Sequence, residues 1–327
     1  MVTPQAAHIS ETLVRQGEPV QLDDLARSLN AYKSVDASAF QRRARVLQSM
    51  WREEQGFDPG EHAGAPLGSR LRMPEAQEQL LNYITPTARD VVKREVLGPA
   101  AKGKLYGKPR IFNDLLSSQP LCFNLFGELT DDLALASDVI RDLTGGRFSR
   151  VTAIEFEESP GRGDPRYLND RSAFDVFVRC EDAESRPGFI GIEVKYHENL
   201  QGPAAEHKPR YDEVADAMAC FVDDRSRLRQ APIQQIWRDH LLAGITLIED
   251  GYVDGMFATL YPADNTHVST ALADYRQQLV NSDSFDAWTM EQFVTALRRH
   301  ASASWIDVFE DRYLAFDKID RELDAAD

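Results

Sequence analysis

Acidic residues interrupt two apolar stretches of this chain, and they constrain its fold more than any other feature. Residues 173–178 read AFDVFV and place Asp175 among apolar neighbours, while residues 189–195 read FIGIEVK and end in Glu193 and Lys195. Both stretches have the length and the polar flanks of buried strands. A carboxylate is costly to bury without a partner. We therefore expect the two acids to meet at a common site.

Alternation of side chains along a strand predicts how they meet. Glu193 and Lys195 are expected on one face, with Gly191 leaving space beside them. On the first strand, Phe174 is expected on the face opposite to Asp175. If the polar stretch between the strands closes a hairpin, Asp175 lies across from Glu193. Two carboxylates there supply the hard oxygen ligands that suit Mg²⁺ or Mn²⁺, with waters completing the coordination.

The pattern of Asp175 followed by Glu193-Val194-Lys195 resembles the motif of the PD-(D/E)XK nuclease superfamily. A helix and a strand at 150–156 are expected before it, and a helix at 233–248 and a strand at 255–261 after it. The order helix, three strands, helix, strand is that superfamily's core topology, so the resemblance implies an α/β, restriction-endonuclease-like fold. More narrowly, a bacterial family of uncharacterised putative restriction endonucleases is similar in three segments, 116–127, 188–200 and 236–242.

The resemblance implies an endonuclease that hydrolyses DNA phosphodiester bonds with Mg²⁺, for which Mn²⁺ substitutes, in a defence or restriction-like role. Asp175, Glu193 and the backbone carbonyl of Val194 would hold the metal. Lys195 would orient or activate the attacking water, or stabilise negative charge on the phosphate. From the residues alone a second interpretation stays open, in which Asp175 and Glu193 belong to a buried salt-bridge network and Lys195 neutralises Glu193.

Further candidates lie on neighbouring elements. Glu155 would bind a second metal or hold a water; the alternative is a solvent-facing acidic strand end at 155–158. Superfamily members often bring an acid or amide toward the metal from the helix before the first strand, where Gln119 and Asn124 occur. Because Pro120 follows Gln119, we expect Gln119 just outside that helix. Capping or packing is the alternative role for Gln119.

The helix after the catalytic strands carries Gln235 and Arg238. Some exonuclease-like branches of the superfamily place a glutamine on this helix near the active site, although the residues after Gln235 depart from the glutamine-then-tyrosine form. Arg238 could grip a phosphate or pair with a surface acid. His197 shares a face with Lys195 if the strand continues, where it would act as a general base or line the cleft.

A formal net charge of −16 counts against indiscriminate nucleic-acid binding, because such binding needs lysine and arginine at the phosphates. A nuclease of this composition needs a local basic track. The candidates are Lys102, Lys104, Lys108 and Arg110 in one segment, and Arg162 and Arg166 in a glycine-rich loop expected to form a flap beside the site. For the first segment, a solvated loop is the alternative. The basic cluster at 41–45 is interpreted as ordinary helix surface.

The chain has 327 residues, of which 43% are hydrophobic, enough for one large core or two modest ones. We predict a helical N-terminal region at 1–112, a nuclease core at 113–262 and a helical C-terminal extension at 263–327, with both outer parts packed on the core. Within them, helices are expected at 9–15, 22–29, 40–54, 74–97 with a break at Pro86, 285–300 and 305–316. A turn-rich stretch is expected at 56–70.

No run of about twenty apolar residues and no secretion-type leader is present, which predicts no membrane contact. Three scattered cysteines without C-x-x-C spacing argue against disulfides and a structural zinc site, so a cytoplasmic protein is expected. DNA is the expected partner, with a homodimer or a partner subunit left open. Two alternatives remain: an RNA-acting nuclease of the same fold, and a catalytically inert module that binds nucleic acid or protein.

Overall fold

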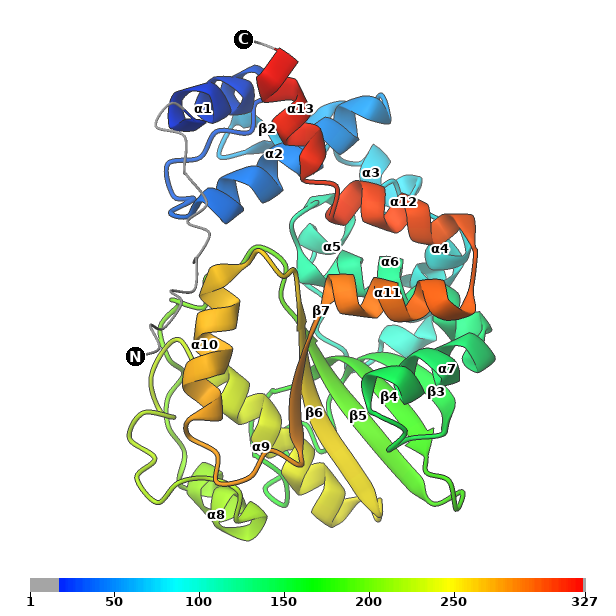
Figure 1. The fold of residues 1–327 in the computed structure, drawn as a ribbon, viewed down its shortest axis with the longest axis vertical. Coiled ribbons are helices and arrows are strands. Elements are labelled where there is room, and N and C mark those ends of the chain that lie inside the picture. Colours follow the sequence, from blue (N-terminus) through cyan, green and yellow to red (C-terminus); the bar gives the residue numbers. More distant parts are fainter. Residues whose placement is uncertain (1–17, 326–327) are drawn as a thin grey trace, which may run out of the picture.

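A five-stranded mixed sheet forms the centre of the fold, with helices on both of its faces (Figure 1). The computed structural model describes residues 18–325. The strands lie in the order β3-β4-β5-β6-β7; β3, β4 and β5 pair antiparallel, and β5, β6 and β7 pair parallel. Their bounds are β3 (Arg150–Glu158), β4 (Phe174–Glu181), β5 (Pro187–Val194), β6 (Asp254–Tyr261) and β7 (Phe285–Thr289).

The predicted order of helix, three strands, helix and strand is confirmed. It corresponds to α6 (Ser118–Asp131), β3 to β5, α9 (Gln234–Glu249) and β6. The helix predicted at 285–300 is wrong for its first five residues, because these form β7 and the helix α11 (Met290–His300) follows. Thr289 and Gln292 form a capping box at this boundary, a start signal that the sequence contains.

Each face of the sheet packs against its own apolar cluster. On one face Ile192 and Val194 of β5 join a cluster under α6, α7 (Leu133–Leu143) and α11. On the other face Phe189 of β5 and Phe257 of β6 join a cluster with α8 (Pro209–Met218), α9 and α10 (Thr266–Arg276). Figure 1 shows α7 and α11 on one side of the sheet and α9 and α10 on the other. The apolar side chains on both faces of the central strands are therefore shielded from water.

The ring of Phe174 belongs to the cluster under α9, which corrects the prediction that it shares a face with Val176. Its ring centroid lies 5.7 Å from that of Phe177, a member of the same cluster. A Cβ atom built at Gly191 would lie 2.4 Å from Phe174 Cε1. The space expected beside Gly191 is therefore filled by this ring, which packs there against other apolar side chains.

The N-terminal part contains two helices and a hairpin. The helices predicted at 22–29 and 40–54 are confirmed as α1 (Glu18–Ser28) and α2 (Ala39–Glu54), while that predicted at 9–15 lies outside the described residues. The turn-rich prediction for 56–70 is wrong, because β1 (Pro59–His62) and β2 (Ala65–Leu71) form a hairpin. Ala63 and Gly64 connect them with φ values of 53° and 77°, the positive pair that a type I′ turn requires.

Short helices complete this region. The helix predicted at 74–97 is divided, and Pro86 begins its second part instead of merely interrupting it, with Thr85 as the capping residue. The elements are α3 (Glu75–Glu78), α4 (Pro86–Val92) with a π-helical continuation η1 (Lys93–Leu97), a 3₁₀ turn η2 (Pro99–Ala101) and α5 (Arg110–Asn113).

The C-terminal helices α12 (Ser304–Tyr313) and α13 (Asp317–Ala325) pack against α2. Arg312 is fully buried there and donates hydrogen bonds to Gln48 Oε1 and to Asn82 Oδ1. One apolar cluster includes residues of α2, α6 and α12, so the parts flanking the sheet share a core with it. No helix among residues 18–325 is long and apolar enough to span a bilayer.

Gly191→Ala is expected to lower the free energy of unfolding by about 1–3 kcal/mol, because the added methyl overpacks the core against Phe174. Chemical denaturation measures the change. Gly202→Ala is the matched control, because a Cβ atom there would meet nothing within 4 Å. Adding Phe174→Leu to Gly191→Ala should recover part of the stability, giving a non-additive double-mutant cycle. A Gly191→Ala protein as stable as the control would contradict the packing described.

Candidate active site

The pairing of β4 with β5 brings the two acids of the apolar stretches together. The antiparallel ladder of β4 with β5 ends where Val176 lies opposite Ile192, and Asp175 and Glu193 are the next residues along the two strands. The backbone N–H of Val194 donates a hydrogen bond to Asp175 Oδ2 at 2.9 Å. Asp175 thereby lies against the end of β5, beside the residue that follows Glu193.

Glu193, Lys195 and Gln235 form a closed set of hydrogen bonds. Glu193 Oε1 accepts from Lys195 Nζ at 2.6 Å and from Gln235 Nε2 at 2.8 Å, and Lys195 Nζ also donates to Gln235 Oε1 at 3.1 Å. Glu193 is 8% exposed and Lys195 7%. Burial opposes the charge on Lys195, but Glu193, then Glu198 and Asp175, raise its pKa, so the side chain is held as an ammonium.

The negative charge of Asp175 is disfavoured in this arrangement. Burial and then repulsion from Glu193 raise its pKa, and attraction to Lys195 and the hydrogen bond from Val194 offset only part of this. One ammonium therefore serves two carboxylates, the buried Glu193 and the half-buried Asp175. A divalent cation would relieve the repulsion, and the hard oxygen donors have the chemistry that Mg²⁺ and Mn²⁺ prefer.

Two carboxylates are too few to complete a metal site. Within residues 18–325, no group of three or more acidic, histidine or cysteine side chains is arranged to hold a metal ion. Asp175 and Glu193 therefore fit a divalent cation that takes its remaining ligands from backbone oxygens and water. Lys195 and Gln235 both bond to Glu193 Oε1, which leaves Oε2 as the oxygen available to such a cation.

The carboxylate that lies beside Asp175 on β3 is Glu157, which corrects the prediction of Glu155. The register of β3 with β4 places Glu155 opposite Phe177, and hence Glu157 opposite Asp175. Glu155 instead pairs with Arg179 at 3.0 Å. Glu157 also has a φ of 49°, a strained backbone conformation of the kind that concentrates at functional sites. Alternation could place both acids on one face, but only the register distinguishes them.

The predicted flap reaches the site through one of its two arginines. Arg162 Nη2 donates to Glu157 Oε1 at 3.2 Å. Burial raises the pKa of Glu157, and Arg162 opposes that rise. The other arginine, Arg166, is exposed and pairs with Asp164 within the loop at 2.7 Å. The structure thus brings Arg162, and not Arg166, to the acids.

Gln119 lies at the edge of the site, inside the first turn of α6. The prediction that it lies just outside the helix is wrong, because α6 begins at Ser118; Pro120 is in the first turn as expected. Gln119 Oε1 accepts from the Gly107 backbone N–H at 2.9 Å, and its Nε2 donates to Glu157 Oε2 at 3.4 Å. Gln119 therefore connects α6 and the basic segment to the acid beside Asp175.

Asn124 does not reach the site. It is fully buried, and its amide accepts from the Ile84 N–H and donates to the Asn82 carbonyl and the Tyr313 hydroxyl. These bonds tie α6 to the segment before α4 and to α12. The Asn124 amide therefore packs these helices together and does not reach the acids, which corrects the accessory role predicted for it.

Gln235 is the helix residue that the structure brings to the acids, whereas Arg238 turns toward the segment before β4. Arg238 Nη2 donates to Ser172 Oγ at 2.9 Å, and its Nε lies 3.7 Å from Asp170 Oδ2. Its acid partner is therefore Asp170, three residues before Ala173.

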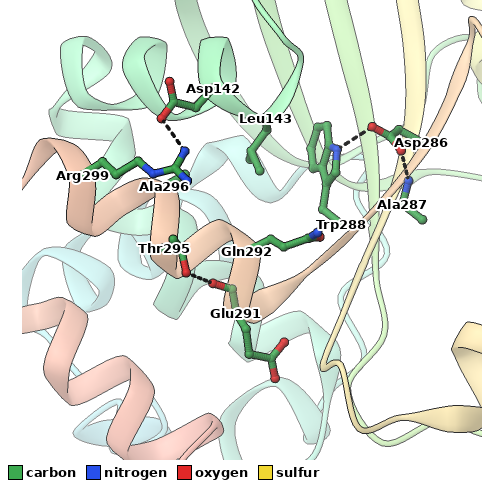
Figure 2. A pocket seen from close by; sticks show the side chains of 10 residues that line it. All are labelled: Asp142, Leu143, Asp286, Ala287, Trp288, Glu291, Gln292, Thr295, Ala296 and Arg299. Carbon is green, nitrogen blue, oxygen red and sulfur yellow. Dashed lines mark hydrogen bonds and ion pairs between the residues drawn. The ribbon is translucent and has the colours of Figure 1, made fainter. Parts of the chain in front are cut away.

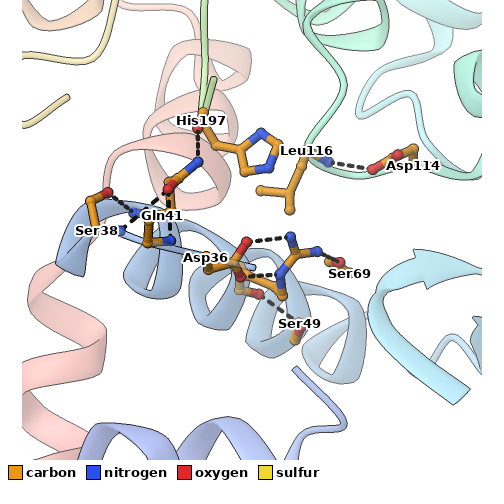
Figure 3. A network of polar contacts seen from close by, with 10 residues as sticks. Asp36, Ser38, Gln41, Ser49, Ser69, Asp114, Leu116 and His197 are labelled. Carbon is orange, nitrogen blue, oxygen red and sulfur yellow. Dashed lines mark hydrogen bonds and ion pairs between the residues drawn. The ribbon is translucent and has the colours of Figure 1, made fainter. Parts of the chain in front are cut away.

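His197 lies beyond the end of β5, which stops at Val194, so strand alternation no longer places it on the face of Lys195. Its backbone carbonyl accepts from Gln41 Nε2 at 3.2 Å, and Figure 3 shows its ring beside Leu116. The general-base prediction for His197 therefore loses its geometric premise. Helix α2 instead fixes the course of the chain just after Lys195.

The basic segment 102–110 lies next to the acids, with its charges partly neutralised. Lys104 pairs with Glu95 at 3.0 Å, and Arg110 lies 3.7 Å from Asp114. Lys102 and Lys108 are exposed, and neither forms an ion pair with another described residue. Between them, Tyr106 lines a cavity of about 10 Å³, roughly one water, together with Glu157 and Asp175.

Asp239 of α9 was not predicted from the sequence. Asp239 is one turn after Gln235, is 3% exposed, and has an Oδ2 atom without a hydrogen-bond partner among the described residues. The available signal was the spacing, because residues four apart share a helix face.

A larger cavity of about 460 Å³ lies between α7, β7 and α11 (Figure 2). Trp288 Nε1 donates to Asp286 Oδ2 at 2.9 Å, and Arg299 donates to Asp142 at 3.4 Å. The polar groups of these four residues are therefore paired within the cavity wall. None of the acids described above lines it. The candidate site is therefore separate from this cavity.

The fold and the site agree on one class of protein: an α/β protein with a mixed five-stranded sheet, carrying an aspartate and a Glu-x-Lys sequence on adjacent strands. The family model of the PD-(D/E)XK nuclease superfamily matches residues 34–315, and the chain belongs to that superfamily. No curated protein and no solved structure matches it.

Asp175→Asn is expected to raise the free energy of unfolding of the metal-free protein at neutral pH, by on the order of 1–3 kcal/mol. Because the folded pKa of Asp175 is raised, the wild type loses stability as the pH rises from the unfolded value, about 4, to the folded value. The variant lacks this loss, and it keeps an oxygen that can accept from Val194.

Denaturation at a series of pH values, with and without Mg²⁺, measures this difference. The gain should appear above about pH 4 and shrink in saturating Mg²⁺, which stabilises only the form that binds it. Asp164→Asn is a control of opposite sign, because hydrogen bonds from Arg166 lower the pKa of Asp164. An Asp175→Asn protein less stable than the wild type throughout would show that the carboxylate is needed for packing.

Proposed function

We propose that this protein is a metal-dependent nuclease that cuts DNA internally, similar to putative bacterial restriction endonucleases. The observation that carries the proposal is that Asp175 and Glu193 lie together at the end of the β4–β5 ladder, with Lys195 Nζ 2.6 Å from Glu193 Oε1. Membership of the superfamily supports a nuclease, and the motif residues Asp, Glu and Lys are all present.

Each of these residues has its own role in the proposed cleavage. Asp175 and Glu193, with the Val194 carbonyl, would hold the cation. A bound Mg²⁺ supplies Lewis-acid activation of the phosphate and of water. Lys195 has three N–H donors, two of which go to Glu193 and Gln235. The third is available to a phosphate oxygen or to the attacking water, where a fixed positive charge lowers the energy of the transition state.

Gln235 and Glu157 have supporting parts in this proposal. Gln235 bonds to both members of the Glu193–Lys195 pair and so fixes their relative orientation. Glu157 places a further negative charge opposite Asp175, where Arg162 partly neutralises it. Arg162 Nη1 is buried without a hydrogen-bond partner among the described residues, so it could donate to a phosphate oxygen.

Cleavage of closed-circular DNA, linear DNA and RNA in Mg²⁺ and Mn²⁺ tests the proposal. Asp175→Asn, Glu193→Gln and Lys195→Gln should each lower the rate by about 10²–10³-fold, the loss typical when one charge-stabilising group is removed. Glu155→Gln should cut like the wild type, because Glu155 pairs with Arg179.

The substrates separate the remaining possibilities. Cutting of closed circles establishes endonuclease action, cutting of linear DNA alone indicates an exonuclease, and cutting of RNA alone changes the substrate. An Asp175→Asn protein that cuts at the wild-type rate would refute the site. No cutting of any substrate would favour an inert binding module.

We expect Lys102 and Lys108 to contact phosphates, since both are exposed beside the acids and free of ion pairs within residues 18–325. In an Asp175→Asn background that blocks cleavage, Lys102→Gln with Lys108→Gln should weaken DNA binding for all sequences. The slope of log affinity against log salt should become shallower by about 0.9 for each phosphate that the variant no longer neutralises.

Fluorescence anisotropy over a range of salt concentrations measures these slopes. The matched control is Arg141→Gln with Arg321→Gln, two exposed cations on the outer helices α7 and α13 that pair with acids of their own helices. An unchanged slope in the lysine variant would place the nucleic-acid surface elsewhere.

A further inference from the structure

Two polar atoms without partners lie between α9 and the sheet. Asp239 of α9 and Thr259 of β6 are 3% and 1% exposed, and neither Asp239 Oδ2 nor Thr259 Oγ1 has a hydrogen-bond partner among the described residues. Buried polar groups are rarely left unpaired, so each such atom calls for an explanation, whether an unseen water, an ion or a functional role.

Both residues adjoin the Glu193–Lys195 pair. Thr259 is in parallel register with Glu193, so the two side chains share a face of the sheet. Asp239 follows Gln235 by one helical turn on the same face of α9, and Gln235 contacts both Glu193 and Lys195. Helix α9 packs on β5 and β6, and Asp239 lies close enough to Glu193 and Lys195 for the charges of both to shift its pKa.

Asp239 forms no ion pair with the described residues around it. Its neighbour Arg238 bonds to Ser172 and lies near Asp170. Burial, then Glu193, raise the pKa of Asp239, with Arg238 and Lys195 opposing and Asp170 adding to the rise. A buried acid in such surroundings destabilises the fold, so its presence favours a functional role over a structural one.

We propose that Asp239 is a positioning residue of the active site, which holds the Lys195 ammonium when Glu193 turns to a divalent cation. This rests on the proposed nuclease function. In the structure Glu193 Oε1 accepts a hydrogen bond from Lys195 Nζ. A cation at Glu193 competes for that carboxylate and repels the ammonium. A second carboxylate on the α9 side offsets this repulsion and keeps Lys195 in place, so the cation and the ammonium can both occupy the site.

Asp239→Asn tests the proposal, because the amide keeps the shape and removes the charge. We expect Mn²⁺ binding, measured by titration calorimetry on the whole protein, to weaken by about tenfold, the effect of a nearby charge worth one pK unit. The unfolding midpoint of the metal-free protein should not fall, since the charge removed lacks a partner and is repelled by Glu193. The kcat should drop with KM unchanged.

Glu249→Gln is the matched control, an exposed acid at the far end of the same helix with the same change in charge. Asp239→Leu provides a second uncharged variant, with the same branching but a larger side chain, and it should lose Mn²⁺ affinity to the same extent. This variant keeps the test decisive if the asparagine protein folds poorly.

Wild-type Mn²⁺ affinity and kcat in both Asp239 variants would overturn the proposal. A lower unfolding midpoint with unchanged Mn²⁺ affinity would also overturn it, because the residue would then be structural only. A wild-type protein that neither binds Mn²⁺ nor cuts would instead defeat the nuclease function, and this inference with it. The two failures are distinguishable because the wild type is measured in each assay.

Discussion

The structure depends on holding two carboxylates, the buried Glu193 and the half-buried Asp175, side by side in a sheet that is covered on both faces. Asp175 and Glu193 can occupy this place only because Lys195 and the backbone of Val194 bond to them, and because Gln235 links Glu193 to α9. The balance is incomplete, since burial and mutual repulsion still raise the pKa of Asp175. Two mutually repelling carboxylates at the ends of two strands have the electrostatics that suit a cation. A bound divalent ion would attract both carboxylates and so offset the repulsion between them.

The parts outside the sheet hold this site in shape. Helix α2 reaches the chain just after Lys195, where Gln41 bonds to the His197 carbonyl (Figure 3). Helix α6 brings Gln119 to Glu157, and the same helix is tied to the C-terminal part by the Asn124 amide. The N-terminal and C-terminal helices therefore share the core of the sheet instead of forming separate attachments. Helix α2 constrains the chain just after Lys195, and the C-terminal part constrains helix α6, which carries Gln119.

The sequence was sufficient where local periodicity decides structure. Apolar runs located β3 to β6, and alternation with a hairpin predicted that Asp175 meets Glu193. It was insufficient where pairing or packing decides. Alternation places Glu155 and Glu157 on the same face of β3, so it does not say which of them lies beside Asp175. Only the strand register identifies Glu157. The ring of Phe174 lies on the unexpected face because Gly191 leaves room there. The β1–β2 hairpin contains no β-branched or aromatic residue, so tertiary pairing outweighs local propensity there.

The strongly acidic composition and a nucleic-acid substrate are compatible only if charge is arranged locally. Lys104, near the site, is already neutralised by Glu95, while Lys102 and Lys108 have no ion-pair partner among the described residues. The acids at the site would repel a phosphate in the absence of a cation. Under the proposed function, bound cation and bound nucleic acid therefore favour one another, and this coupling is reciprocal. Such a protein would bind its substrate weakly in the absence of metal, with the basic segment supplying attraction and the cation removing the repulsion between the acids and the phosphate.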